Sequence, residues 1–166
     1  MKKLSVLFTA VLLFVAASTV SAQKVAALDV NAILNLMPEK KAADAKLEAL
    51  SKTKGAEIEK LRNEAEALYK KYSEDAPKQT AAVNETRSAE LQKMQEKVQQ
   101  LMQAAQKDVA EKTDAEYAPI EKKFQDAVDK AAKANNWDFV MDANSNFLIY
   151  KGGPDATAAV KKELGL

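Results

Sequence analysis

The chain has 166 residues, contains no cysteine or histidine, and carries a formal net charge of +1 at pH 7. Its length predicts one domain rather than two. The lack of cysteine excludes a disulfide framework, and the near-neutral charge does not favour nucleic acid or another strongly acidic partner.

The first 22 residues are predicted to be a cleaved secretory signal peptide. Lys2 and Lys3 precede an apolar run from Leu4 to about Ala17, and small residues lead up to Ala22. The alternative is a membrane anchor, but serine and threonine interrupt the run, whose unbroken part falls short of the ~20 residues that a bilayer span needs. Cleavage after Ala22 removes two lysines and changes the net charge from +1 to −1. We therefore expect an exported, near-neutral protein.

Residues 23–37 are predicted to form a strand and a short helix. The segment "KVAALDV" is apolar at both odd and even positions, which is typical of a strand covered on both faces. The run "AILNLM" then predicts one helical turn. Pro38 suits the first position of the next helix, and Glu39 follows at the positive end of that helix.

Residues 38–118 are predicted to form a long antiparallel helical hairpin, here called the arm. The first helix runs from Pro38 to about Ser73 and consists mostly of the strong helix formers Ala, Glu, Lys and Leu. Its apolar residues recur every three or four positions, with one gap at Lys54, as a narrow stripe resembling a coiled-coil edge. This stripe contains Ala43, Leu47, Leu50, Ile58, Leu61, Ala65, Leu68 and Tyr72.

The tip of the arm is expected near residues 74–80. Asp75 can cap a helix start and Pro77 suits a first turn, so a second helix is predicted from about Pro77 to Asn135. Its stripe contains Val83, Leu91, Met94, Val98, Leu101, Ala105, Val109, Tyr117, Ile120, Phe124, Val128 and Ala131.

Pro119 lies within the second helix and is predicted to kink it. Folding the chain back at Pro77 sets Pro38 level with Glu116. By this count the kink comes where the first helix has already ended.

Residues 119–166 are predicted to form a returning helix, a β-hairpin and a terminal helix. The strands "WDFVMD" and "NFLIY" flank a polar turn at Ala143 to Asn146. Pro154 and Asp155 precede the terminal helix, which Gly165 is expected to end. The predicted fold class is thus mainly α with a small β body (α+β), in which the short-stranded body carries the arm.

Neither part is expected to be stable alone, since the body buries little core and a two-helix arm buries only one stripe. Oligomerisation through the strands is the expected support. The residues predicted to form the body and its subunit contacts are Val25, Ala27, Leu28, Val30, Trp137, Phe139, Val140, Met141, Phe147 and Ile149.

Catalysis is not expected. Asp29, Asp138, Asp142 and Asp155 invite a catalytic or metal-binding interpretation, but no pattern places two of them in a shared cleft. The chain has no histidine or cysteine to act as base, nucleophile or soft ligand. No phosphate-binding loop is present, so we expect a protein without cofactors, metals or enzymatic activity.

The segments "KVAALDV", "LNLMPEKKAA" and "WDFVMDANSNFLIYKGGPDATAAV", together with the order of the predicted elements, resemble the Skp (OmpH) family of periplasmic chaperones. The resemblance covers the whole mature chain. It implies a jellyfish-like homotrimer whose strands form a shared body and whose three arms enclose a cavity. It also implies a periplasmic, ATP-independent holdase that keeps unfolded outer-membrane β-barrel proteins, its clients, from aggregating.

The charge of this chain departs from the family pattern, in which well-known members are clearly basic. Residues 39–113 carry 15 basic and 14 acidic side chains. We therefore infer neither strong electrostatic binding of clients nor a lipopolysaccharide site. A membrane surface remains as a further partner, through weak contact only.

Four residues of the arm are candidates for contact with clients: Tyr69, Tyr72, Met94 and Met102. Methionine adapts to irregular surfaces, although packing between the two helices is the simpler interpretation for both methionines. The two tyrosines can equally well cover the turn at the tip.

Two other functions remain as alternatives. The chain could be an envelope-structural or adaptor coiled coil without chaperone activity, although such a protein would not need the strands. It could also be an amphipathic lipid binder, but this needs a wide apolar face with a basic border, which the narrow and near-neutral arm lacks.

Overall fold

The computed structural model describes residues 23–166, so the predicted signal peptide lies outside the described residues. Among the described residues, no helix combines the length and the apolar character that crossing a membrane requires. They form two compact units: a helical unit, Asn35–Lys123, and a sheet unit, residues 23–34 with Phe124–Leu166. One boundary between the units lies between Leu34 and Asn35, and the other falls within the longest helix, α4, Ala81–Asn135.

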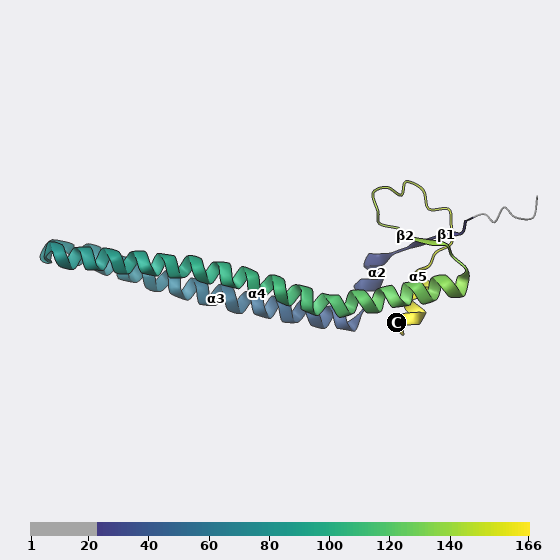
Figure 1. The fold of residues 1–166 in the computed structure, drawn as a ribbon, viewed down its shortest axis with the longest axis horizontal. Helices are drawn as coiled ribbons and strands as arrows, with labels where there is room; N and C mark the ends of the chain where they lie inside the picture. The colour runs from purple at the N-terminus through teal and green to yellow at the C-terminus, as the bar shows by residue number, and fades with distance from the viewer. Residues whose placement is uncertain (1–22) are drawn as a thin grey trace, which may run out of the picture. The chain divides into compact units, whose positions relative to one another are not determined.

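The sheet unit contains two short parallel strands (Figure 1). Strand β1, Val25–Leu28, pairs with β2, Phe139–Asp142, in a register that sets Val25 beside Phe139 and Leu28 beside Asp142. The second edge of β1 is also occupied, because the Ala27 N–H donates to the Pro154 carbonyl over 2.8 Å and the Ala27 carbonyl accepts from the Ala156 N–H over 2.8 Å. Within the described chain, only β2 keeps an edge without strand pairing.

The predicted β-hairpin is not formed within the single chain. β2 exists where it was predicted, but it pairs with β1 instead of with residues 147–150, which form no strand. Two successive tight turns redirect the chain: the Ser145 N–H donates to the Asp142 carbonyl over 3.2 Å, and the Leu148 N–H donates to the Ser145 carbonyl over 3.0 Å. These local bonds carry "NFLIY" away from β2, and no strand of the same chain replaces it there.

The core of the sheet unit is small and alanine-rich. It packs one face of β1 against helix α2, Val30–Leu34, the C-terminal part of α4 and helix α5, Thr157–Leu164. Its buried members are Ala26, Leu28, Ile33, Ala127, Ala131, Ala156 and Val160. As predicted, Gly165 ends α5: its φ of 73° is in the left-handed region, and its N–H donates to the Lys161 and Lys162 carbonyls.

The helical unit contains helix α3, Pro38–Asp75, the short 3₁₀ turn η2, Ala76–Lys78, and the first part of α4, Ala81–Asn135. Pro38 occupies the start of α3 as predicted. The second helix begins later than predicted, since Pro77 lies in η2 and Thr80 precedes α4. The Thr80 hydroxyl accepts from the Val83 N–H over 3.3 Å. Asp75 ends α3 and precedes η2, but its side chain makes no capping hydrogen bond there.

Helices α3 and α4 lie side by side and antiparallel within the helical unit (Figure 1). Ion pairs join Glu39 to Lys123 near one end and Asp75 to Arg87 near the other. Both intervals span 36 residues, so the register is constant over ~54 Å at 1.5 Å per residue.

The register differs from the one predicted by folding the chain at Pro77. Because η2 and Thr80 come before α4, the residue midway between paired positions of the two helices is about Ala81 and not Pro77. The N-terminal end of α3 therefore lies beside Lys123, whereas the prediction placed it beside Glu116. Helix α4 continues through Pro119, and α3 is therefore still beside it at the proline. The predicted end of the arm at residue 118 is correspondingly five residues short of the unit boundary at Lys123.

The stripe predicted on α3 is the face that the structure covers. All eight apolar residues of the stripe are buried or half-buried, and so is Lys54 in the gap. On α4 the predicted stripe is covered from Leu91 onwards, but Val83 is 38% exposed. Near the tip, Asn84 and Arg87 occupy the covered positions in place of Val83.

Candidate functional site

The most prominent surface of the sheet unit is apolar and uncovered. Successive side chains of a strand point to opposite faces, and here one face of the sheet packs on the core while the other presents Val25, Phe139 and Met141 at 38%, 52% and 45% exposure. The segment 147–150 adds Phe147 and Ile149, which are 94% and 98% exposed. We call these five residues, with Tyr150 at 82% exposure, the apolar surface.

The ten residues predicted for the body thus divide into two groups. Five lie on the apolar surface: Val25, Phe139, Met141, Phe147 and Ile149. Four others, Leu28, Val30, Trp137 and Val140, are buried or half-buried and belong to the core or pack against it. Ala27, the tenth, is half-buried on the same face of the sheet as Val25 and Met141. Sequence reasoning did not separate the groups, because alternation along a strand does not say which face is covered.

The four aspartates that invited a catalytic interpretation all accept main-chain hydrogen bonds. Asp29 Oδ1 accepts from the Ala32 N–H over 2.9 Å at the start of α2, and Asp138 Oδ2 accepts from the Lys24 N–H over 2.8 Å. Asp142 and Asp155 each accept from the N–H two residues further on. These carboxylates organise turns and helix starts, and among residues 23–166 no cluster of acidic side chains is arranged to hold a metal ion.

Hydrogen bonding also lowers the pKa of two of these carboxyl groups. The Ala32 N–H, followed by the Asn144 amide, lowers the pKa of Asp29 below its usual value. The Thr157 hydroxyl and N–H lower the pKa of Asp155. Asn144 Nδ2 donates to Asp29 Oδ1 over 2.9 Å, which ties the turn after β2 to the start of α2.

The helical unit is joined by polar contacts along its whole length. Lys54 in the gap of the stripe pairs with Asp108 at 2.7 Å, Lys46 pairs with Glu116 at 2.9 Å, and the Tyr117 hydroxyl donates to Asp44. The hydrogen bond from Lys54 lowers the pKa of Asp108. These contacts fix the register that a narrow apolar stripe alone specifies weakly.

The tip contains a compact polar cluster. Arg87 pairs with Asp75 at 2.8 Å and lies over the Tyr72 ring, with its guanidinium carbon 4.7 Å from the ring centroid. The Tyr72 hydroxyl donates to Glu90 over 2.6 Å, and Gln79 also donates to Asp75. Tyr72 therefore holds the two helices together at the tip.

The four candidate client contacts are placed differently from one another. Tyr69 is 63% exposed and lines an open hollow of about 520 Å³ on α3. Tyr72, Met94 and Met102 are half-buried between the helices. Met102 Sδ also accepts from the guanidinium of Arg62 over 3.2 Å. Of the four, Tyr69 has the side chain most available to a partner.

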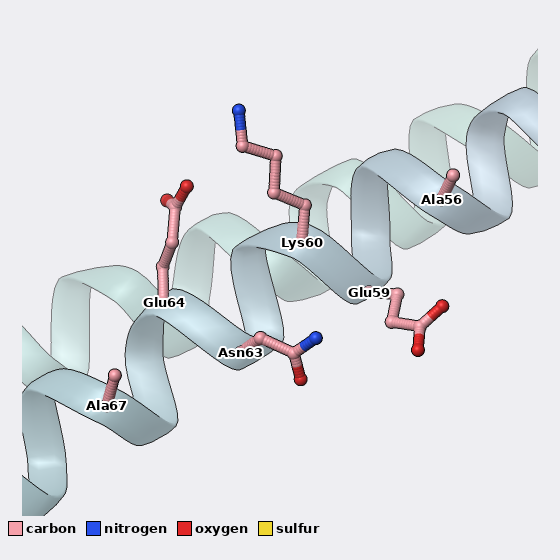
Figure 2. Close-up of a pocket in the computed structure, with 6 residues that line it drawn as sticks. All are labelled: Ala56, Glu59, Lys60, Asn63, Glu64 and Ala67. Atoms are coloured by element: carbon pink, nitrogen blue, oxygen red, sulfur yellow. The ribbon is translucent and has the colours of Figure 1, made fainter.

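A second open hollow, of about 530 Å³, lies on the outer face of α3 (Figure 2). Short side chains form its floor at Ala56 and Ala67, and longer polar side chains stand around it at Glu59, Lys60 and Glu64, with Asn63 beside them. It is a shallow depression on one helix rather than an enclosed site, which suits weak contact with a chain but not a small ligand.

The chain thus combines a long antiparallel helical pair with a small unit whose parallel sheet has an uncovered apolar face. The profile of a family described as outer membrane protein (OmpH-like) matches residues 24–164. The chain belongs to this OmpH-like family, which confirms the resemblance to Skp (OmpH) proteins.

Comparison with solved structures supports the fold. A crystal structure of a candidate outer membrane chaperone (OmpH-like) from Caulobacter crescentus is similar, with a TM-score of 0.71, over 87% of this chain and 85% of that one. The two sequences are 18% identical, so this likeness concerns the fold alone. No curated protein matches the sequence.

Proposed function

We propose that this protein is an ATP-independent holdase chaperone of the bacterial periplasm. In this proposal, three copies assemble through their sheet units, and their helical units enclose an unfolded outer-membrane β-barrel precursor. Membership of the OmpH-like family supports a chaperone of this type. The predicted signal peptide supports export to the periplasm.

The observation that carries the proposal is the apolar surface of the sheet unit. A monomer rarely leaves several large aromatic and aliphatic side chains such as Phe139, Phe147 and Ile149 exposed to water. β2 also keeps an unpaired edge, which is a template for another strand. A neighbouring copy that supplies residues 147–150 to this edge would cover both features and provide the strand pairing that the single chain lacks.

The helical unit is suited to transient contact rather than tight binding. Its outer surface is polar, its net charge is close to zero, and its hollows are open. Many weak contacts inside a cage retain a client by their number while each contact exchanges rapidly. The client's own unpaired strand edges and apolar residues would be shielded from other clients, which prevents aggregation.

The deciding experiment measures the mass of the mature protein by light scattering, alone and after a urea-unfolded outer-membrane barrel protein is diluted into it. We expect the mass of three protomers, and then three protomers with one soluble client. A monomer or dimer that lets the client precipitate would overturn the proposal and favour an adaptor coiled coil.

A truncated helical unit tests the enclosure directly. The pairing of Lys54 with Asp108 shows that residues 53 and 109 lie at the same level of the two helices, so a cut there leaves matched ends. We expect a variant with Thr53 to Val109 replaced by a short glycine-containing turn to keep the oligomer mass and lose most protection of clients. Full protection by this variant would show that the helices do not form the holding surface.

A further inference from the structure

Helix α4 carries a local concentration of glutamine that neither the apolar stripe nor the polar contacts between the helices explain. Six of the nine glutamines of the chain lie within residues 92–106. Residues 98–106 contain no charged side chain, and this is the longest uncharged run within α3 or α4. The middle of the helical unit therefore differs in composition from its two ends.

Five of these glutamines form a row on one side of the helix. They are spaced three or four residues apart, which places them above one another along α4. All are exposed, and none of their side chains makes a hydrogen bond within residues 23–166. We call them the glutamine row: Gln92, Gln95, Gln99, Gln103 and Gln106.

The position of the row follows from the contacts between the helices. Met102, next to Gln103, accepts from Arg62 on α3, and Arg62 is the neighbour of Asn63 in the hollow of Figure 2. The row and the hollow thus lie at the same level of the helical unit. At this level the outer surface offers amide groups and short side chains.

We propose that the glutamine row binds the main chain of extended, unfolded polypeptides through hydrogen bonds to peptide groups. A primary amide has two N–H donors and a carbonyl acceptor, so it can pair with both the C=O and the N–H of a peptide group. The row is ~21 Å long, at 1.5 Å per residue. An extended chain of roughly six residues has this length at about 3.3 Å per residue.

This proposal rests on the proposed holdase function and adds the chemistry by which clients are held. Peptide groups are common to all clients, so recognition through them does not depend on client sequence. Amides carry no charge, so the contact suits a helical unit whose basic and acidic residues nearly balance. Each bond to a water-exposed amide is weak, and retention would come from several acting together.

The first test replaces all five glutamines of the row with alanine. Alanine has the highest helix propensity, so the helix is expected to remain intact while the amides are lost. The control variant replaces exposed charged residues in equal numbers of each sign: Lys41, Glu48, Lys52 and Glu85, all to alanine. Circular dichroism and light scattering establish that both variants keep helicity and oligomer mass.

The readout is the apparent affinity for a urea-unfolded outer-membrane barrel protein, measured by fluorescence anisotropy at low and high salt. We expect the five-alanine variant to bind roughly tenfold more weakly, because several amide contacts are lost together, and the charge control to bind as the original protein does. The loss should be equal at both salt concentrations, because salt screens charges and not amide hydrogen bonds.

A second variant replaces the same five glutamines with glutamate, which keeps the side-chain length and the acceptors but removes the donors. We expect weakened binding that high salt does not restore. If either variant of the row binds as the original protein does at high salt, the glutamine row is not the contact. If the original protein itself fails to hold the client, the proposed function is wrong instead, so the two failures are distinguishable.

Discussion

At the scale of single residues, the position of a side chain relative to a covered face decides its role more than its type does. Tyr69 and Tyr72 are three residues apart on one helix, yet Tyr69 is 63% exposed while Tyr72 lies beneath Arg87 and donates to Glu90. Ile33 and Ile149 differ in the same way, with 0% and 98% exposure. One isoleucine stabilises the sheet unit, and the other is available to a second copy.

Ile33 provides the test at this scale. Ile33→Ala removes a fully buried side chain from a small core, and we expect a loss of about 2–5 kcal/mol in the free energy of unfolding. Urea unfolding followed by circular dichroism measures this loss. The control Val83→Ala, at a position 38% exposed on α4, should change the free energy by less than about 0.5 kcal/mol. Equal effects of the two substitutions would contradict the assignment of the core.

At the scale of elements, α3 and α4 are held in register by carboxylates paired with cations or hydroxyl groups. The pKa values of Glu39, Asp75 and Asp108 are lowered, in each case first by a hydrogen bond from the cation that pairs with it. The pKa of Asp44 is lowered by Lys40 first and by Tyr117 second. The ionised form of each carboxylate is therefore favoured in the folded helical unit.

These lowered pKa values predict acid sensitivity of the helical unit. A carboxyl group with a depressed folded pKa stabilises the folded state above its unfolded pKa, near pH 4, and this stabilisation is lost as the pH falls through the folded pKa. We expect the melting temperature to be nearly constant from pH 7 to about pH 5 and to fall below about pH 4. Thermal melts followed by circular dichroism test this.

Asp108→Asn supplies the control for the acid test. The variant should melt lower than the original protein at pH 7, where the ion pair with Lys54 is missing, and the two should converge at pH 2. A constant difference at all pH values would show that ionisation of Asp108 does not contribute.

Pro119 supplies a second test at the scale of elements. A proline within a helix removes one hydrogen bond and clashes with the preceding turn, at a cost of about 3 kcal/mol in a helix interior. Helix α4 nevertheless continues through Pro119, with the contacts of Tyr117 and Lys123 to α3 on either side of it. Pro119→Ala should therefore raise the free energy of unfolding by about 1–3 kcal/mol, measured by urea denaturation. No gain in stability would show that the chain accommodates this proline without cost.

At the scale of the whole molecule, the apolar surface predicts self-association of the chain. We expect Phe139→Asp with Ile149→Asp to dissociate the proposed oligomer, because burial of two carboxylates in an apolar contact is strongly unfavourable. Sedimentation or light scattering measures the mass of the variant. A matched variant with Leu36→Asp and Val83→Asp, at exposed apolar positions outside the sheet unit, should keep the mass of the original protein. An unchanged mass of the first variant would exclude the apolar surface as the interface.

The sequence by itself determined the helices, their covered stripe and several of their ends. The stripe from Ala43 to Tyr72, the start of α3 at Pro38 and the end of α5 at Gly165 were all predictable. The reason is that helix periodicity, caps and turn residues act over a few neighbouring positions. The same local signals identified "VAAL" and "FVMD" as strands.

Only the tertiary structure decided which strands pair and which surfaces stay open. "FVMD" lies close in sequence to "NFLIY", yet it pairs with β1 at a separation of 114 residues, because the core gathers β1, α2, α4 and α5 around one face of the sheet. The register of α3 against α4 likewise depends on distant partners such as Lys54 and Asp108. A local pattern cannot specify either choice, since competing pairings satisfy the same periodicity and differ only in the contacts made far along the chain.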